Sequence, residues 1–155
     1  MPTLIALLRG INIGGNNKLP MKELTALLEG MGLRDVQTYI QSGNVVFRCD
    51  VKNRAALAAK IGAAIADNPY PEAEADPKSL SLLFLAEVPQ HPDLKAMEAI
   101  KTDSERYKLV GKVLYLHAPE GFGRSRLATR AEKLLGVAAS GRNWNTVCKL
   151  AEMVA

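Results

Sequence analysis

The stretch of this sequence most suggestive of chemistry is Gly10–Pro20, a segment rich in glycine and asparagine that also carries Lys18. It lies between a short apolar run and a helix-like pattern, so its backbone N–H groups and the lysine could together hold an anion. A nucleoside-triphosphate loop needs a lysine and a hydroxyl residue directly after its second glycine. Here Asn16 and Asn17 follow Gly15, and the lysine comes too late. We therefore expect no triphosphate site.

The dinucleotide-binding fingerprint fails in the same segment, because Asn12 occupies the place of its second glycine when counted from Gly10. Two interpretations of the segment stay open. It is either a looser anion-binding nest, or a tight connection that uses glycine for positive φ and asparagine for its own turns.

Two further polar segments precede predicted helices. Gly123–Arg126 places two arginines around a serine, and Ser140–Val147 places Arg142 and Asn143 before Trp144. A helix start attracts anions through its free N–H groups and its dipole, and arginine adds a bidentate grip. The simpler alternatives are a solvated basic face for the first segment, and an asparagine cap before a core tryptophan for the second.

We group eight polar residues at strand ends, turns or helix starts as candidate ligand-binding residues. They are Arg9, Asn12, Lys18, Ser42, Asn44, Arg124, Arg142 and Asn143. We expect them to line one groove between two halves of the chain and to bind a phosphate-bearing ligand or nucleic acid. Nucleic acid would bind with a steep dependence on salt.

The usual catalytic and metal-binding patterns are missing, so the catalytic residues are unknown and no metal or cofactor is expected. His91 and His117 have no partner at metal-ligand spacing, and no Gly-x-Ser-x-Gly elbow occurs. Two alternative functions remain. One is a small enzyme that uses Ser42 or a cysteine as nucleophile, and the other is an interaction module that pairs through a sheet edge.

Composition favours a cytoplasmic globular protein. The chain has 155 residues, of which 48% are hydrophobic and 23% charged, and no apolar run is long enough to span a bilayer. Cys49 and Cys148 lie far apart in sequence and are expected to be reduced thiols. The net charge is +4, and residues 119–149 carry six Lys/Arg against only Glu120 and Glu132. A basic face of this kind can attract phosphates.

The first half, residues 1–76, has the order strand, helix, strand, strand, helix. The apolar run 3–9 predicts a buried strand, and residues 36–40 and 44–47 predict a hairpin across Gln41-Ser42-Gly43. A second helix is expected over 54–67. This order predicts an α+β, ferredoxin-like half. Aromatic residues make up only 5% of the chain, which argues against an RNA-recognition sheet.

The acidic, proline-bearing stretch 71–78 predicts a boundary, followed by a smaller α+β half over residues 77–155. The expected strands are 79–86, 106–110 and 113–117, the last two forming a hairpin across Gly111-Lys112. The expected helices cover 92–101, 125–135 and 144–153, the second ended by Gly136 and the third capped by Asn143.

Several of these motifs together resemble the uncharacterised bacterial DUF1697 family. They are Leu7–Gly15, Asn17–Met21, Tyr39–Phe47, Asn68-Pro69-Tyr70, Pro119–Ser125 and Arg142–Val147. The resemblance covers nearly the whole chain. It implies an α+β fold with a ferredoxin-like first half and a smaller second half, and it implies no established activity.

The chain departs from the family pattern in two places. The stretch between Phe47 and Asn68 is shorter than usual by about one helix–strand unit, so a strand of the first sheet is either missing or supplied by Val51 and its neighbours. Where many relatives carry threonine before Arg-Asn, this chain has Ser140-Gly141. A hydroxyl at position 141 is therefore not expected to be needed.

Overall fold

The computed structural model describes residues 3–9, 11–12, 17–49 and 63–154 of the chain. Contacts divide the chain into two compact units. Unit 1 comprises Met1–Ala66 together with Cys148–Ala155, and unit 2 comprises Asp67–Val147. The division predicted from the sequence, 1–76 and 77–155, stays a prediction.

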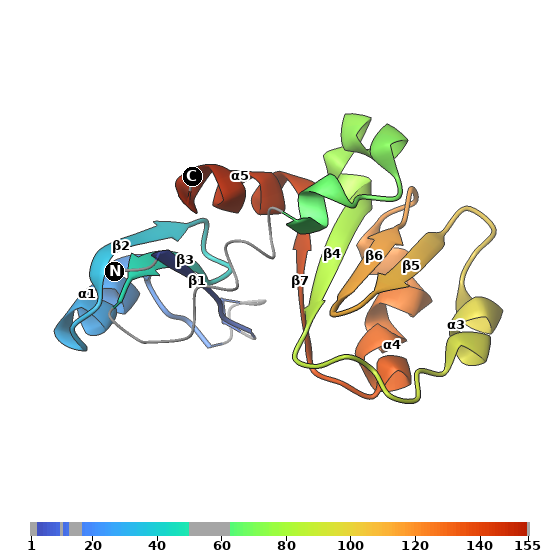
Figure 1. Ribbon diagram of the computed structural model, residues 1–155, viewed down its shortest axis with the longest axis horizontal. Helices are drawn as coiled ribbons and strands as arrows, with labels where there is room; N and C mark the ends of the chain where they lie inside the picture. Colours follow the sequence, from blue (N-terminus) through green and yellow to red (C-terminus); the bar gives the residue numbers. More distant parts are fainter. Residues whose placement is uncertain (1–2, 10, 13–16, 50–62, 155) are drawn as a thin grey trace. The chain divides into compact units, whose positions relative to one another are not determined.

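Unit 1 contains, in its described part, an antiparallel sheet of three strands (Figure 1). The strands are β1 (Thr3–Leu7), β2 (Arg34–Tyr39) and β3 (Asn44–Arg48), and α1 (Met21–Gly30) connects the first two. The sheet order is β1-β3-β2, so β3 lies between the two strands that the helix joins. This is a split β-α-β arrangement and confirms an α+β fold with antiparallel pairing. The ferredoxin-like form requires a fourth strand and stays a prediction.

The central strand β3 carries the core of this sheet. Val45 and Val46 are consecutive, so their side chains point to opposite faces. They are 0% and 3% exposed, which means that both faces of the strand are covered. Val46 pairs with Ile5 on β1, and Leu24 is the buried residue of α1.

The predicted helix over residues 54–67 is described only at its end. Residues 63–66 are helical and Asp67 forms a turn. The rest of that helix, and the strand that Val51 was expected to supply, lie outside the described residues.

The β2–β3 hairpin turns through residues 40–43, as the glycine there predicted. Gly43 has φ of +87°, a conformation that side chains rarely adopt. A Cβ added to Gly43 would lie 2.6 Å from Leu8 Cβ and 2.9 Å from Ile11 Cδ1. The Leu8 N–H donates to the Gly43 carbonyl oxygen at 2.8 Å. The turn therefore packs directly against the segment that follows β1, and it leaves no room for a side chain.

Unit 2 is built on a second antiparallel sheet with the order β5-β6-β4-β7. Its strands are β4 (Leu80–Leu85), β5 (Arg106–Val110), β6 (Val113–His117) and β7 (Ala139–Asn143). The predicted β5–β6 hairpin is confirmed with its bounds, and Gly111 at its turn has φ of +57°.

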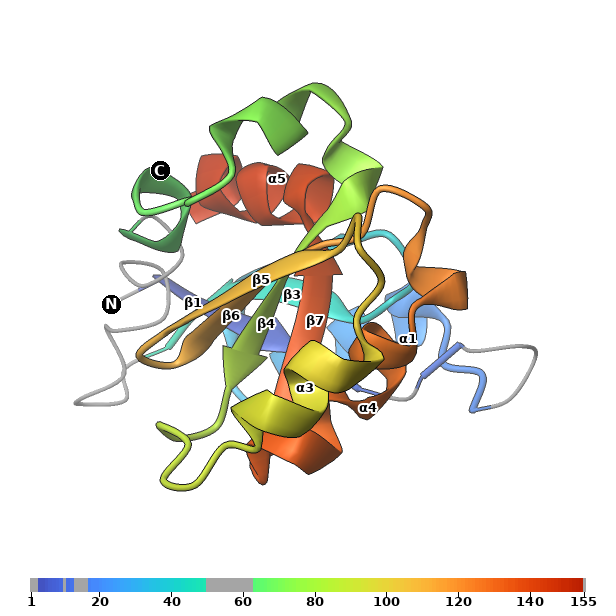
Figure 2. The ribbon, with the colours of Figure 1, turned by 90° about the vertical axis from the view of Figure 1, so that its right-hand side faces the viewer.

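Two helices, α3 (Leu94–Ile100) and α4 (Arg126–Leu135), cover one face of this sheet (Figure 2). The core beneath them is apolar. It contains Leu85, Met97, Leu114, Leu116, Leu127, Ala131, Leu135 and Ala139. Leu82 and Tyr115 pair across β4 and β6, point to the opposite face and are equally buried, so the central strands are covered on both sides.

Both ends of α4 follow local rules, of which the one at Gly136 was used to predict the helix. Ser125 is the N-cap, and its Oγ accepts a hydrogen bond from the Ala128 N–H at 3.0 Å. Gly136 ends the helix in the left-handed conformation, with φ of +73°. A short 3-10 helix, η3 (Phe122–Arg124), precedes the cap.

The segment before the last helix corrects the sequence prediction. Residues 140–143 were expected to be a polar cap, but they form most of strand β7, which pairs with β4. The helix α5 (Trp144–Val154) follows at once, and Asn143 Oδ1 accepts from the Thr146 N–H at 3.0 Å, as a cap does. The strand was missed because pairing with β4, rather than an apolar pattern, makes this polar sequence extended.

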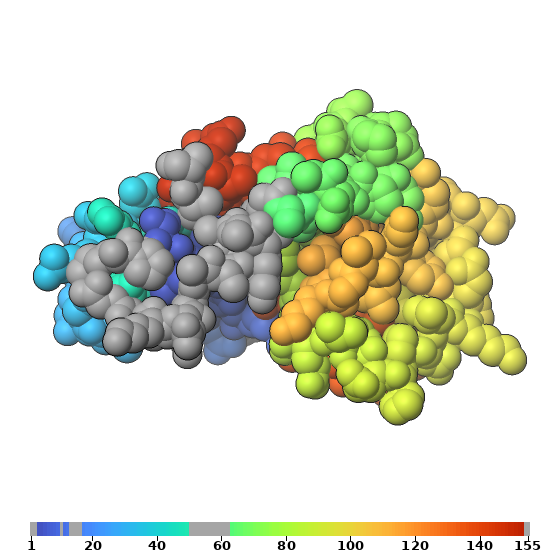
Figure 3. Space-filling model, in the orientation of Figure 1, coloured from blue at the N-terminus to red at the C-terminus, as the bar shows by residue number. Residues whose placement is uncertain are grey.

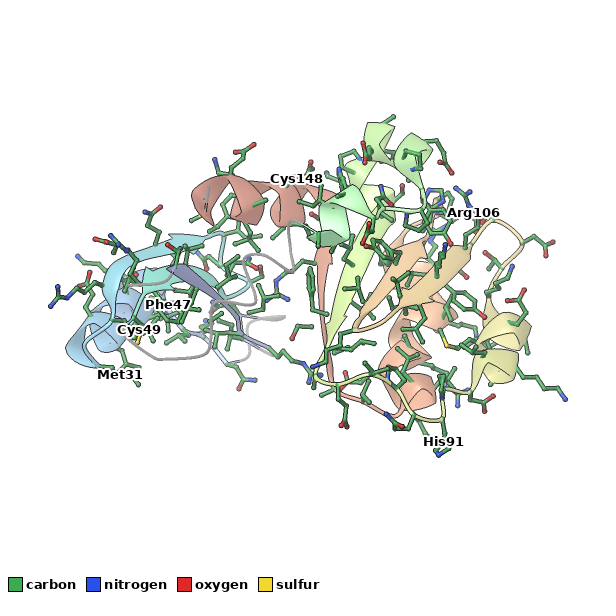
Figure 4. The ribbon with its side chains drawn as sticks, in the orientation of Figure 1. Met31, Phe47, Cys49, His91, Arg106 and Cys148 are labelled. Atoms are coloured by element: carbon green, nitrogen blue, oxygen red, sulfur yellow. The ribbon has the colours of Figure 1, made fainter. Side chains whose placement is uncertain are left out.

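Three smaller expectations can be compared with the structure. The predicted boundary stretch 71–78 forms two 3-10 helices, η1 (Pro71–Ala75) and η2 (Pro77–Ser79). Cys49 and Cys148 are not joined by a disulfide, are half-buried and lie well apart in Figure 4. Among the described helices, none has the length and hydropathy that a bilayer crossing requires.

Replacing Gly43 by alanine tests the tight turn. We expect Gly43→Ala to lower the free energy of unfolding by about 2–4 kcal/mol, because the new Cβ adds overpacking to an unfavourable φ. Gly32→Ala is the matched control, since Gly32 also has φ of +87° but no atom within 4 Å of its added Cβ. We expect that control to lose only about 1–2 kcal/mol. Urea unfolding measures both, and equal losses would contradict the packing argument.

Candidate functional site

Asn12 closes the loop between β1 and α1. It has φ of +53°, and its Oδ1 accepts from the Leu19 N–H at 2.7 Å. Its Nδ2 donates to the carbonyl oxygens of Leu19 at 2.9 Å and Gln41 at 2.8 Å. The amide therefore ties the loop to the start of α1 and to the β2–β3 turn. We call this set of bonds the Asn12 clasp, and it positions the residues on either side of it.

A groove of about 600 Å³ opens beside the Asn12 clasp. It is lined by Asn12, Lys18, Pro20, Met21, Lys22 and Gln41, and we call it the Lys18 groove. Lys18 and Lys22 are exposed, and neither forms an ion pair or hydrogen bond with another described residue. Two of the candidate residues, Asn12 and Lys18, thus meet at one surface, and Asn12 serves mainly to shape it.

The other candidates in unit 1 do not line the Lys18 groove. Asn44 is fully buried, and its Nδ2 donates to the Tyr39 carbonyl oxygen at 3.0 Å and to Ser42 Oγ at 2.8 Å. These bonds close the β2–β3 turn. Ser42 and Arg9 are exposed.

A second basic groove, of about 290 Å³, lies at the start of α4 in unit 2. Its lining residues are Gly123, Arg124, Ser125, Arg126, Thr129 and Arg130, and we call it the arginine groove. All three arginines are exposed, and none forms an ion pair or hydrogen bond with another described residue. The segment Gly123–Arg126 pointed to Arg124 and Arg126, and the next turn of the helix adds the guanidinium group of Arg130 to the same surface.

A buried carboxylate supports this groove from beneath. Glu105 is 3% exposed, and its Oε1 accepts from the Thr102 N–H at 2.8 Å. Its Oε2 accepts from the hydroxyl of Ser125, the N-cap of α4. Glu105 therefore joins the turn before β5 to the N-cap of α4. It also lines a small cavity beside Arg124.

Arg142 and Asn143 lie on β7 and do not line the arginine groove. Arg142 is half-buried, its Nη1 donates to the Gly141 carbonyl oxygen at 2.8 Å, and burial lowers the pKa of its guanidinium. Asn143 uses its side-chain oxygen as the cap of α5. The cap interpretation of Asn143 is thus confirmed, and Trp144 is buried as that interpretation required.

The structure brings the candidate residues to separate surfaces within each unit. That all eight share one groove between two halves stays a prediction. Sequence reasoning placed Arg126 in the anion-attracting segment Gly123–Arg126 but left it out of the eight candidates, and it missed Lys22, Gln41, Arg130 and Glu105. The basic window 119–149 was a visible signal for the two arginines, since residues four apart on a helix share a face. The spacing Thr102-x-x-Glu105 is a local signal for the bond of Glu105 to the Thr102 N–H, but no signal in the sequence marked its bond to Ser125.

The chemistry available at the described surfaces is electrostatic. The described residues contain no group of three or more His, Cys, Asp or Glu side chains arranged to hold a metal ion. Ser42, the candidate nucleophile, accepts from the Asn44 amide, and an amide donor does not withdraw a proton from a hydroxyl. Both grooves instead present cations to solvent.

A family comparison accounts for most of the sequence. Residues 1–68 and 58–115 match the family described as "Protein of unknown function (DUF1697)". The chain belongs to this family. The match confirms the resemblance drawn from the N-terminal motifs, and it brings no activity with it. No curated protein matches the chain.

A solved structure shares the fold. It is that of the conserved bacterial protein SP0830 from Streptococcus pneumoniae, with a TM-score of 0.71 and 22% sequence identity. The similarity covers 99% of this chain and 98% of that one. At this identity the likeness shows that the two proteins have the same fold.

Substitution of Asn12 tests the clasp. We expect Asn12→Ala to lower the free energy of unfolding by about 2–4 kcal/mol, because it removes three side-chain hydrogen bonds and places alanine at positive φ. Asn12→Gly tolerates that φ, so its smaller loss of about 1–3 kcal/mol isolates the hydrogen bonds. Chemical denaturation measures both. A glycine variant as stable as the wild type would show that the clasp contributes nothing.

The contact between Glu105 and Ser125 restricts which residues can cap α4 at position 125. Aspartate usually caps a helix as well as serine does. Here we expect Ser125→Asp to be less stable than Ser125→Ala, which should itself lose about 1–2 kcal/mol, because a second carboxylate would face Glu105. Adding Glu105→Gln should restore part of the loss in the aspartate variant. Thermal melts of the single and double variants measure these stabilities. A Ser125→Asp protein as stable as the wild type would contradict the expected repulsion between the two carboxylates.

Proposed function

We propose that this protein binds a phosphate-bearing ligand, and that the arginine groove of unit 2 is the principal binding surface. The observation that carries the proposal is that Arg124, Arg126 and Arg130 line one groove with no carboxylate paired to any of them among the described residues. Three adjacent cations repel one another, and a bound anion would relieve that repulsion.

The cluster is a local feature rather than a result of general positive charge. Unit 2 contains eleven Lys/Arg and eleven Asp/Glu residues, so it is neutral overall. Among the described residues no carboxylate lines the arginine groove itself, although Glu105 and Glu120 line a small cavity beside Arg124. Glu105 is already bonded to Thr102 and Ser125. A neutral unit with one concentrated basic groove favours a localised anion over nonspecific attraction.

The lining of the groove favours phosphate over other anionic groups. Guanidinium presents paired donors that match two oxygens of a phosphate, and arginine is the usual choice for such contacts. The first N–H groups of a helix lack intrahelical acceptors, and α4 begins at Arg126 in this groove. Among the described residues, the lining contains no aromatic side chain on which a base could stack. The groove thus suits the phosphate of a ligand, including the backbone of a nucleic acid.

The Lys18 groove of unit 1 is proposed to serve the same class of ligand. Lys18 and Lys22 are point charges without the fork of arginine, so they attract anions with less directional selectivity. The volume of about 600 Å³ falls in the range of small-molecule sites. The Asn12 clasp holds Leu19, the residue next to Lys18, which reduces the ordering cost of binding.

Charge removal tests the arginine groove. We expect the Arg124→Gln/Arg126→Gln/Arg130→Gln variant to bind inorganic pyrophosphate or a short fluorescent oligonucleotide at least about tenfold more weakly, since each lost bidentate contact is worth about 1 kcal/mol or more. Titration calorimetry and fluorescence anisotropy at low and high salt measure the affinity. An oligonucleotide, unlike pyrophosphate, should show a steep salt slope.

The matched control removes the same charge from another part of unit 2. Lys95, Lys108 and Lys112 are exposed and form no ion pair with another described residue. The triple Lys→Gln variant at these positions should keep its affinity within about twofold. Equal losses of affinity in the two triple variants would show that net charge, and not the arginine groove, determines binding. Absence of binding by the wild type to either probe would overturn the proposal. A Lys18→Gln/Lys22→Gln variant separates the contribution of the second groove.

A further inference from the structure

A separate cluster of titratable side chains holds the beginning of unit 2 against its sheet. Residues 70–79, which include η1 and η2, adjoin the β5–β6 hairpin, as the green and orange surfaces of Figure 3 show. Asn68 organises the start of this segment. Its Oδ1 accepts from the Tyr70 N–H at 3.0 Å, and its Nδ2 donates to Glu74 Oε1 at 3.0 Å.

Arg106 makes side-chain contacts between this segment and the sheet, in addition to the backbone bond from the Ala118 N–H to the Ser79 carbonyl oxygen at 2.8 Å. It lies at the start of β5, beside η1 and η2, in Figure 4, and its cross-strand partner is His117 on β6. Its Nη2 lies 3.1 Å from His117 Nδ1 and forms an ion pair with Glu72 of η1. Its Cζ lies 4.5 Å from the centroid of the Tyr70 ring, a cation–π contact. We call Arg106, Glu72, His117 and Tyr70 the Arg106 latch.

The hydrogen-bonding capacity of Arg106 determines the protonation state of His117 in the latch. An arginine guanidinium only donates hydrogen bonds, so His117 Nδ1 must accept from it. The imidazole is therefore neutral, with its proton on Nε2. Protonation would put an N–H on Nδ1, turn two donors toward each other and place two positive charges in contact.

Other groups that face His117 also affect its pKa, but they do not remove the repulsion between a protonated His117 and Arg106. Burial and the Arg106 charge lower the pKa of His117, while the carboxylates of Glu72 and Asp76 raise it by less. The Tyr70 ring lies beside the imidazole, with 6.1 Å between the ring centroids, and its phenol has a pKa raised by burial, so it is neutral near pH 7. The net effect favours the neutral imidazole in the folded protein.

We propose that the Arg106 latch is pH-sensitive, holding residues 70–76 firmly against the sheet at neutral pH and loosening them when His117 is protonated. The contacts that would be lost are the guanidinium–imidazole hydrogen bond and the cation–π contact between Arg106 and the Tyr70 ring. Tyr70 is 9% exposed, so loosening would uncover an aromatic ring next to the β5–β6 hairpin. The device is independent of the arginine groove, because it uses none of the residues that line it.

The sign of the pH dependence follows from the lowered pKa. A group whose folded pKa lies below its unfolded value stabilises the folded state above the unfolded pKa, and that contribution is lost as pH falls through the folded value. For histidine the loss begins near pH 6.5. The pKa of Glu72 is lowered from 4.5, chiefly by its hydrogen bond to Arg106, so measurements kept above pH 5 leave this carboxylate ionised.

Hydrogen exchange of the full chain at pH 7.5 and 5.2, corrected for the intrinsic pH dependence of exchange, tests the latch. In the wild type we expect peptides covering residues 70–79 to exchange roughly three- to tenfold faster at the lower pH, while peptides from β4 and β6 change little. Proton NMR should show that the pKa of His117 lies below the usual value for histidine, about 6.5. His91 is the other histidine of the chain and is exposed. In Figure 4 His91 lies far from Arg106.

Two asparagine variants make the test decisive. His117→Asn places a non-titrating acceptor near the position of Nδ1, so the latch should stay closed and the pH effect should vanish. His91→Asn should keep the full effect. The proposal is overturned if residues 70–79 exchange at the same corrected rate at both pH values, or if His117→Asn retains the wild-type pH dependence.

Discussion

The geometry of unit 2 depends on the buried carboxylate of Glu105. A buried charge is tolerated only when hydrogen bonds replace the water it has lost. Here the Thr102 N–H and the Ser125 hydroxyl do so, and each of them belongs to a different part of the unit. The first bond shapes the turn that leads directly into Arg106, and the second fixes the N-cap of α4 beside Arg124. The latch and the arginine groove are therefore positioned by the two oxygens of one side chain.

The elements that could be predicted from the sequence are those governed by short-range rules. The β5–β6 hairpin follows from Gly111, and the ends of α4 follow from Ser125 and Gly136. Strand β7 could not be predicted in this way, because its residues are polar and only pairing with β4 makes them extended. The same limit applies to the bond between Glu105 and Ser125, which lie far apart along the chain and meet only in the folded unit.

The candidate residues show why a binding site is harder to predict than a fold. Asn12, Asn44 and Asn143 have the polarity that a ligand would need, yet their amides serve the backbone of a loop, a turn and a helix start. An asparagine amide uses the same atoms to bind a ligand and to bond to the backbone, so the residue type and position cannot distinguish the two roles. Cations are more informative where several meet at one surface, because single lysines without a described partner, such as Lys95, are common on a solvated face. Arg124, Arg126 and Arg130 meet in this way.

The division of the chain also sets an order for its synthesis. Unit 1 is assembled from the first and the last segments of the sequence, and the whole of Asp67–Val147 lies between them. At roughly 5–20 residues per second, the closing segment of unit 1 leaves the ribosome roughly 4–16 s after Ala66. Unit 2 is by then complete and contiguous, whereas β1 and β3 still lack the end of α5. Unit 1, whose first segment is synthesised before unit 2, is thus completed only after unit 2.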